Sequence, residues 1–254
     1  MDHRAAIGSG RRKDNKCHGI NNVLWKAVEP PAVNVSVAML RQNLIIISAG
    51  KFGREVYTWA RQAIQAGTLW SIKGFLDDRR DILRSFRYET PILGPVEEYE
   101  PAAGDLFICA VAEPTLKKHY CSMLEQKGGL FGTLVHPTAL VGHEARIGYG
   151  CILGPFTQLS CDLRLGKHVA FGTHSNTAHD TSVGDYCQIS GSCEINGNAV
   201  LEEGVFLGSH ATILPKAHVG AWAYVGAGSV VLKRVGPGVK VFGNPAVPIG
   251  DLGK

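Results

Sequence analysis

The sequence predicts an α/β domain with a parallel sheet, followed by a β-solenoid built from six-residue repeats. Between residues 43 and 133, short apolar runs alternate with amphipathic stretches of helical period, which is the order of a parallel sheet covered by helices. From residue 134 to residue 235, a large apolar residue recurs at every sixth position instead. That period suits short strands joined by tight corners.

The first domain is expected to begin with a strand over Leu44 to Ile47, a glycine-containing turn and a helix. One face of this helix is apolar. It consists of Val56, Trp59, Ala60, Ala63 and Ile64. A further strand ends at Gly74-Phe75-Leu76-Asp77-Asp78, and another runs from Leu106 to Val111. A helix over residues 113–126 follows, with Leu116, Tyr120, Met123 and Leu124 inward. This order predicts a small Rossmann-like domain over residues 43–133.

The solenoid repeat has a single exception. From Val135 to Val231 there are 17 positions spaced by six residues, and 16 of them hold a large apolar residue; the exception is Thr177. Glycine follows this position in nine hexads, which suits close backbone approach at corners. These glycines are Gly142, Gly148, Gly154, Gly166, Gly172, Gly184, Gly208, Gly220 and Gly226. Each coil needs its neighbours to bury its inward residues.

Charge and composition separate the ends of the chain from its body. Residues 1–42 carry the whole formal charge of +4 and include the basic run Arg11-Arg12-Lys13, so a loosely ordered extension is expected there. Residues 236–254 are expected to form a C-terminal tail. The body is neutral and lacks the basic, aromatic-rich surface that nucleic-acid binding needs.

Cysteine usage and hydropathy indicate a cytoplasmic protein. The seven cysteines are odd in number and contain no CxxC pair, which is typical of reduced thiols. The sequence contains no run of about 18 apolar residues, so no membrane insertion is expected.

The hexad that breaks the apolar rule also carries acid–base residues. It reads Thr177-Ala178-His179-Asp180-Thr181-Ser182, and its third residue is expected at a corner, facing outward. Acyl transfer from a thioester needs a base that works near neutral pH, and histidine supplies one. A neighbouring carboxylate can hold the tautomer and stabilise the imidazolium. His179 and Asp180 are therefore the candidate catalytic residues.

Several motifs together resemble a known family. The repeats are similar to those of the hexapeptide-repeat acyltransferases, which wind a left-handed parallel β-helix. The resemblance narrows to bacterial sugar acetyltransferases of the PglD/NeuD type and covers about residues 43–250. The motifs that narrow it are the strand-turn-helix, Gly74-Phe75-Leu76-Asp77-Asp78, Ile92-Leu93-Gly94, His179-Asp180 and Gly243-Asn244-Pro245-Ala246. The resemblance implies transfer of an acetyl group from acetyl-CoA to a sugar amine or hydroxyl. The acceptor would be a nucleotide-linked amino sugar or sialic acid.

The resemblance also implies a site. The histidine that matches His179 is the base, the acid that matches Asp180 raises its basicity, and no metal is required. Acetyl-CoA lies in the groove between two helices of a homotrimer, so two subunits would build the site. The implied contacts to acetyl-CoA are Gln188, Gly197, Ser209, Gly226, Ala227 and Gly228.

The α/β domain would hold the nucleotide sugar at the carboxyl ends of its strands. The residues implied are Gly50, Lys51, Phe52, Asp77 and Asp78. The turn lacks one glycine of the three-glycine dinucleotide fingerprint. Phe52 stands where the family commonly has histidine, which removes a polar contact to the phosphate or sugar. The charge of Lys51 can compensate.

Alternative functions stay open at this point. The γ-type carbonic anhydrases share the β-helix and bind zinc through three histidines. His174 and His179 have the spacing of such a pair, but the third position is Thr138, and zinc catalysis needs three protein ligands. A non-catalytic scaffold or nucleotide-sugar-binding protein is a further alternative. No covalent enzyme intermediate is expected, and Cys161, one turn below His179, is the only candidate nucleophile that would overturn this expectation.

Overall fold

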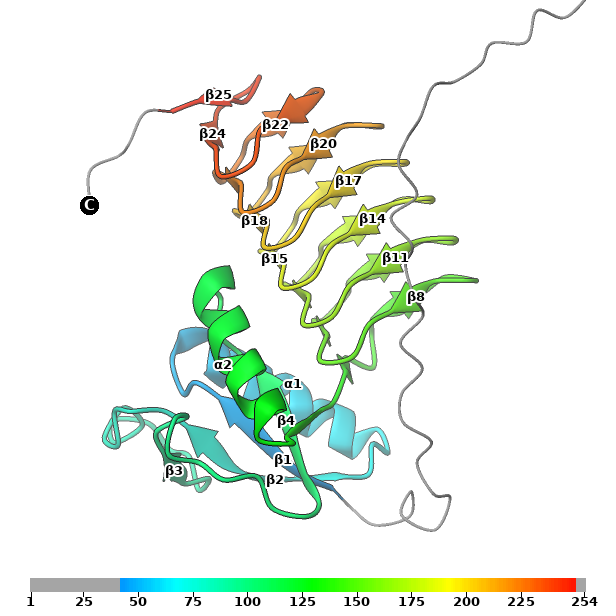
Figure 1. The fold of residues 1–254 in the computed structure, drawn as a ribbon. Helices are drawn as coiled ribbons and strands as arrows, with labels where there is room; N and C mark the ends of the chain where they lie inside the picture. The colour runs from blue at the N-terminus through cyan, green and yellow to red at the C-terminus, as the bar shows by residue number, and fades with distance from the viewer. Residues whose placement is uncertain (1–41, 250–254) are drawn as a thin grey trace, which may run out of the picture. The chain divides into compact units, whose positions relative to one another are not determined.

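The structure, a computed structural model, describes residues 42–249. The extension expected over residues 1–42 lies outside the described residues apart from its last residue, and residues 250–254 lie outside them as well. The described part contains a parallel α/β unit followed by a three-sided β-solenoid (Figure 1). None of its helices is long and apolar enough to cross a membrane.

Five parallel strands form the sheet of the α/β unit, in the order β3-β2-β1-β4-β5. They are β1 (Gln42–Ile47), β2 (Trp70–Leu76), β3 (Ile92–Gly94), β4 (Asp105–Cys109) and β5 (Leu130–Phe131). In the central strand β1, Leu44, Ile45, Ile46 and Ile47 are all fully buried. A continuous apolar run is what a parallel strand needs when both faces of its sheet are covered.

Helix α1 (Lys51–Gln65) covers one face of this sheet. The apolar face predicted for it is confirmed, because Val56, Trp59, Ala60 and Ala63 are buried. These residues form one hydrophobic cluster with alternate residues of β1. The position of α1 therefore follows from its own amphipathic pattern.

Helix α2 (Pro114–Gln126) covers the other face. Its N-terminus is capped by Glu113, whose carboxylate accepts hydrogen bonds from two backbone N–H groups of the first turn. The predicted inward face is wrong at Leu116, which is exposed. The buried face is centred on Lys117 and Cys121 instead, because α2 packs against the solenoid as well as the sheet.

The solenoid has three sides, each a sheet of short strands. The first side consists of β6 (Leu134–Val135), β9 (Ile152–Leu153), β12 (Ala170–Phe171), β15 (Gln188–Ile189), β18 (Phe206–Leu207), β21 (Tyr224–Val225), β24 (Lys240–Phe242) and β25 (Val247–Pro248). The second side consists of β7 (Leu140–Val141), β10 (Gln158–Leu159), β13 (Asn176–Thr177), β16 (Glu194–Ile195), β19 (Thr212–Ile213) and β22 (Val230–Val231). The third side consists of β8 (Arg146–Ile147), β11 (Arg164–Leu165), β14 (Ser182–Val183), β17 (Val200–Leu201), β20 (His218–Val219) and β23 (Arg234–Val235).

The six-residue period is confirmed by the core of the solenoid. The inward residues of successive strands form one hydrophobic cluster along its length. Thr177 occupies the same inward position, because it pairs with Leu159 and Ile195 of the neighbouring coils. It is only 3% exposed, and its hydroxyl has no hydrogen-bond partner within residues 42–249. The broken hexad therefore places an unpaired hydroxyl in the core.

Two backbone features shape the corners. From Glu144 to Gly228, every sixth residue has a left-handed backbone conformation, with φ between 54° and 64° wherever it is not glycine. This conformation is unfavourable for residues with a side chain, so the stacking of the coils must stabilise it. The predicted close approach occurs elsewhere in the hexad. At Gly142 and Gly208, a Cβ atom would lie 2.6 Å from backbone atoms of the next coil.

The segment expected to be a C-terminal tail contains two strands. β24 extends the first side by pairing with β21, and β25 pairs with β24 in the antiparallel direction. The antiparallel strand covers the last edge of this sheet, which would otherwise present unpaired backbone groups.

Polar contacts fix α2 to the solenoid. Lys117 is fully buried, and its Nζ donates hydrogen bonds to the carbonyl of Cys187 at 3.2 Å and to Oε1 of Gln188 at 2.9 Å. Burial lowers the pKa of the Lys117 amine. A buried ammonium would need a carboxylate partner, whereas here the amine is satisfied by a carbonyl and a side-chain amide oxygen.

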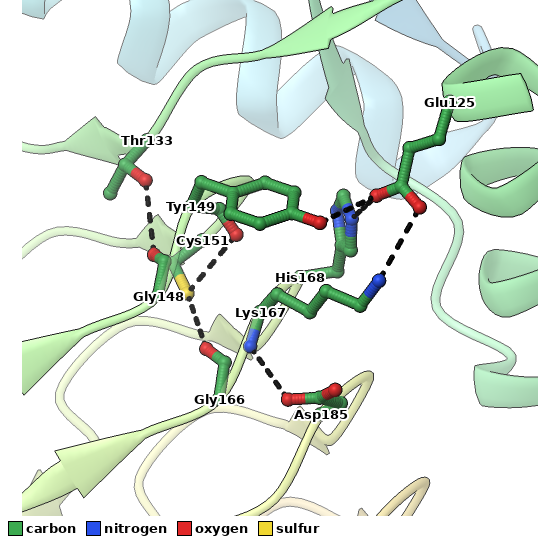
Figure 2. A network of polar contacts seen from close by, with 9 residues as sticks. All are labelled: Glu125, Thr133, Gly148, Tyr149, Cys151, Gly166, Lys167, His168 and Asp185. Carbon is green, nitrogen blue, oxygen red and sulfur yellow. Dashed lines mark hydrogen bonds and ion pairs between the residues drawn. The ribbon is translucent and has the colours of Figure 1, made fainter. Parts of the chain in front are cut away.

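At the end of α2, Glu125 contacts three side chains from two successive corners of the solenoid (Figure 2). Its carboxylate lies 3.1 Å from the hydroxyl of Tyr149, 3.3 Å from Nζ of Lys167 and 2.7 Å from Nε2 of His168. Together with Lys117, these contacts set the position of the α/β unit on the solenoid.

We expect Thr177→Val to stabilise the protein by about 1 kcal/mol, because a methyl group of similar shape replaces an unpaired buried hydroxyl. Thr181→Val is the matched control. Thr181 is also buried, but its hydroxyl donates to the carbonyl of Ala178 at 2.8 Å, so its replacement should destabilise the protein. Denaturant unfolding of both variants measures the two changes. A loss of stability in Thr177→Val would show that its hydroxyl is paired.

Candidate active site

The corner between β13 and β14 carries His179 and Asp180 side by side. Nδ1 of His179 lies 2.8 Å from Oδ2 of Asp180. Asp180 occupies the left-handed corner position, with φ of 56°. The two side chains are 58% and 57% exposed, so His179 faces outward at a corner as the repeat predicts.

This geometry leaves one ring nitrogen of His179 free for chemistry. When Nδ1–H donates to Asp180, the lone pair of Nε2 can accept a proton. Gly197 of the next coil lies beside this nitrogen, because a Cβ atom at position 197 would be 3.0 Å from Nε2 and Cε1. Glycine at this position leaves space beside the ring. Of the residues predicted to contact acetyl-CoA, Gly197 therefore lies next to His179.

A second group of predicted cofactor residues lies at another corner, between the first and second sides. Ser209, Ala227 and Gly228 are exposed there, and Gly226 is buried beside them. The N–H of Gly228 donates to the carbonyl of Ser209 at 2.9 Å, so the two residues belong to adjacent coils of one corner. Within one chain, this corner is separate from the corner of His179.

Gln188 lies on β15, beneath α2. It is 4% exposed, and its Oε1 accepts the hydrogen bond from Lys117. In the described chain it holds the helix in place, and its contact with acetyl-CoA stays a prediction.

The predicted nucleotide-sugar residues gather at the carboxyl edge of the α/β sheet, where β1 and β2 end side by side. Gly50 is the N-cap of α1, and no side chain caps this end of the helix. Lys51 is exposed, and the ring of Phe52 packs against Trp59 with 5.9 Å between ring centroids. The first backbone N–H groups of α1 therefore form a place where an anion can bind.

Asp77 is held by contacts within the chain. Its Oδ2 accepts a hydrogen bond from the N–H of Ala49 at 3.0 Å, and the guanidinium of Arg79 donates to both carboxylate oxygens at 2.9 and 3.0 Å. Burial by itself would raise the pKa of Asp77, but these hydrogen bonds outweigh it and lower the pKa. Asp78 is exposed, and its pKa is raised by partial burial and by the nearby Glu97.

Arg79 is a candidate site residue that the sequence reasoning missed. Its side chain is 66% exposed, and its guanidinium lies 3.9 Å from where a Cβ of Gly50 would be. It adds a positive charge beside the N-terminus of α1. The sequence signal that could have found it is the position of Arg79 two residues after Asp77, the acid that directly follows β2.

The residues considered for zinc do not meet. His174 is stacked on Phe156, with 4.9 Å between ring centroids. Across residues 42–249, no group of three or more His, Cys, Asp or Glu side chains is arranged to hold a metal ion.

Comparison with known proteins agrees with this fold. Residues 198–233 match the family model described as bacterial transferase hexapeptide (six repeats). GDP-perosamine N-acetyltransferase of Escherichia coli O157:H7 is 29% identical over 208 residues, which cover 79% of this chain and 93% of that protein.

Two solved structures are similar over most of the chain. WeeI from Acinetobacter baumannii AYE is 28% identical with a TM-score of 0.73, covering 82% of this chain and 100% of the other. The acetyltransferase domain of PglB from Neisseria gonorrhoeae FA1090, in complex with acetyl coenzyme A, is 27% identical with a TM-score of 0.74, covering 83% and 100%. Residues 198–233 therefore match bacterial transferase hexapeptide repeats, and the fold of most of the chain is similar to that of these two structures. The resemblance of the chain to sugar acetyltransferases of the PglD/NeuD type is confirmed.

We expect Arg79→Gln to bring the pKa of Asp77 back toward its ordinary value. A carboxyl whose pKa is lowered by folding stabilises the native state above its unfolded-state pKa, and this stabilisation is lost as the pH falls through the folded-state value. The variant should therefore lose less stability than the wild type between about pH 5 and pH 2.

Thermal unfolding at several pH values in this window checks the expectation. Arg80→Gln is the control, because Arg80 is an exposed neighbour. Equal losses of stability in the wild type and Arg79→Gln would contradict the role of Arg79.

Proposed function

We propose that this protein transfers an acetyl group from acetyl-CoA to an amine of a nucleotide-linked sugar. The observation that carries the proposal is the His179–Asp180 pair at an exposed corner of a hexapeptide-repeat solenoid. Similarity to GDP-perosamine N-acetyltransferase over 93% of that protein supports an amino-sugar acceptor. The PglB domain in complex with acetyl coenzyme A supports the donor.

His179 acts as the base in this reaction. Its Nε2 takes a proton from the acceptor nitrogen while that nitrogen bonds to the carbonyl carbon of the thioester. The carbon–sulfur bond then breaks, and the imidazolium gives the proton to the departing sulfur. Asp180 keeps the proton on Nδ1 and stabilises the imidazolium. Gly197 leaves the space beside Nε2 in which the reacting groups meet.

The α/β unit is proposed to be a Rossmann-like domain that binds the nucleoside end of the acceptor. Its central strand, the uncapped N-terminus of α1 and the guanidinium of Arg79 meet at one sheet edge. Backbone N–H groups at a helix N-terminus favour a phosphate. Lys51 supplies positive charge where Phe52 supplies none, and the guanidinium of Arg79, paired with Asp77, has further N–H groups to donate.

We further propose a left-handed solenoid and a homotrimer with shared sites. Within one chain, His179 lies at a different corner from Ser209 and Ala227. This separation supports a site shared by two subunits, because a neighbouring copy can bring its Ser209 corner against the His179 corner. The free thiols described in the chain support a cytoplasmic location.

Thiol release from acetyl-CoA, measured against a panel of nucleotide-linked amino sugars, free amino sugars and sialic acid, tests the function. We expect turnover with at least one acceptor, and His179→Ala should lower kcat by about 10² to 10⁴. His143→Ala is the matched control, because His143 is exposed in the same column two coils away and also precedes an acid. It should retain activity.

A fall in kcat for both variants alike would remove His179 from the role of base. Turnover with hydroxyl acceptors alone would overturn the amine specificity. Failure to bind acetyl-CoA would overturn the enzyme function and favour a scaffold.

A further inference from the structure

A charged cavity begins directly beside the candidate base. It has a volume of about 250 Å³. It is lined by Glu144, Arg146, Asp162, Leu163, Arg164 and Asp180. Asp180 is the residue that holds His179, so one end of the cavity is the catalytic corner itself.

Two arginines form the wall of this cavity on the third side of the solenoid. Arg146 on β8 and Arg164 on β11 are direct neighbours in parallel strands, and both are exposed. Like charges placed opposite each other on adjacent strands are unfavourable. Within residues 42–249, neither guanidinium forms an ion pair with a carboxylate. The pair therefore has its hydrogen-bond donors free for a group outside the chain, and a phosphate suits two adjacent guanidinium groups.

The arginine pair ends one coil before that of His179. The outward position that holds Arg146 and Arg164 is occupied by Ser182 in the next coil and by Val200 in the one after. The cavity thus has the two arginines toward one end and, at its other end, Asp180, the partner of His179. Adjacent coils are about 4.8 Å apart, so Arg164 and Arg146 lie about 5 and 10 Å along the solenoid from the coil of His179.

We propose that Arg146 and Arg164 bind the sugar-side phosphate of the acceptor and thereby place the amino group at Nε2 of His179. This inference rests on the proposed function. A nucleotide sugar carries a phosphate on one end of its sugar ring, so a phosphate held by the arginines leaves the ring to extend toward the coil of His179.

The carboxylates of the cavity complement this arrangement. Glu144, Asp162 and Asp180 occupy the same corner position in three successive coils. Their oxygens can accept hydrogen bonds from the hydroxyl and amino groups of a sugar. The two arginines are therefore positioning residues for the acceptor, and the carboxylates face the sugar itself.

The test compares the double variant Arg146→Gln, Arg164→Gln with Arg234→Gln. Arg234 is exposed on β23, in the same outward row of the third side but beyond the cavity. In the double variant we expect the KM for the nucleotide-linked acceptor to rise about ten-fold or more, because charge-assisted hydrogen bonds are lost. The KM for acetyl-CoA should stay unchanged in the double variant, and kcat should fall because the amino group is held less precisely at Nε2. All these constants should stay unchanged in Arg234→Gln.

The kinetic outcomes separate the two phosphate sources. A rise in the KM for acetyl-CoA alone would assign the arginines to a phosphate of CoA and overturn the proposal. Unchanged constants in an active double variant would also overturn it, while leaving the proposed function in place.

Calorimetric titration with inorganic pyrophosphate gives a readout without turnover. We expect binding to the wild type and to Arg234→Gln, with weaker binding to the double variant. If the wild type acetylates no acceptor but shows this pattern, the proposed function fails and the anion site stands. Equal binding by all three proteins would overturn the anion site.

Discussion

The registry of 18 residues between successive coils is the constraint on which the rest of the structure depends. Parallel pairing places each residue beside its counterpart 18 positions away, as in the pairs of Asn176 with Gln158 and Glu194. The inward positions then build a continuous core, and the corner positions build columns. A catalytic side chain on such a column is held by the backbone hydrogen bonds of the coils on both sides.

The same registry lets neighbouring coils divide their tasks. His179 is the proposed base, Gly197 above it leaves space, and Asp180 shares a corner column with two further acids. On the first side, Gln188 is used to hold α2 through Lys117. The proposed base therefore lies at the corner between the second and third sides, whereas the α/β unit is held on the first side. A substitution on one side need not disturb the other.

The sequence predicted most of what depends on local pattern. The six-residue period located the inward residues and the corner of His179, and the apolar face of α1 was correct. The expectation for α2 failed at Leu116, because this helix meets the solenoid as well as the sheet and buries Lys117 instead. Arg79 and the arginines of the cavity were missed, because isolated basic residues carry no periodic signal.

By itself, the sequence determined the solenoid, the order of the α/β elements and the exposed His179–Asp180 corner, since each follows from spacing along the chain. Only the tertiary structure decided which residues from distant parts of the chain contact one another. Asp77 contacts Ala49, which is 28 residues away, and Lys117 contacts Gln188, which is 71 residues away. Such contacts depend on how separate elements pack together, and residue spacing does not encode that packing.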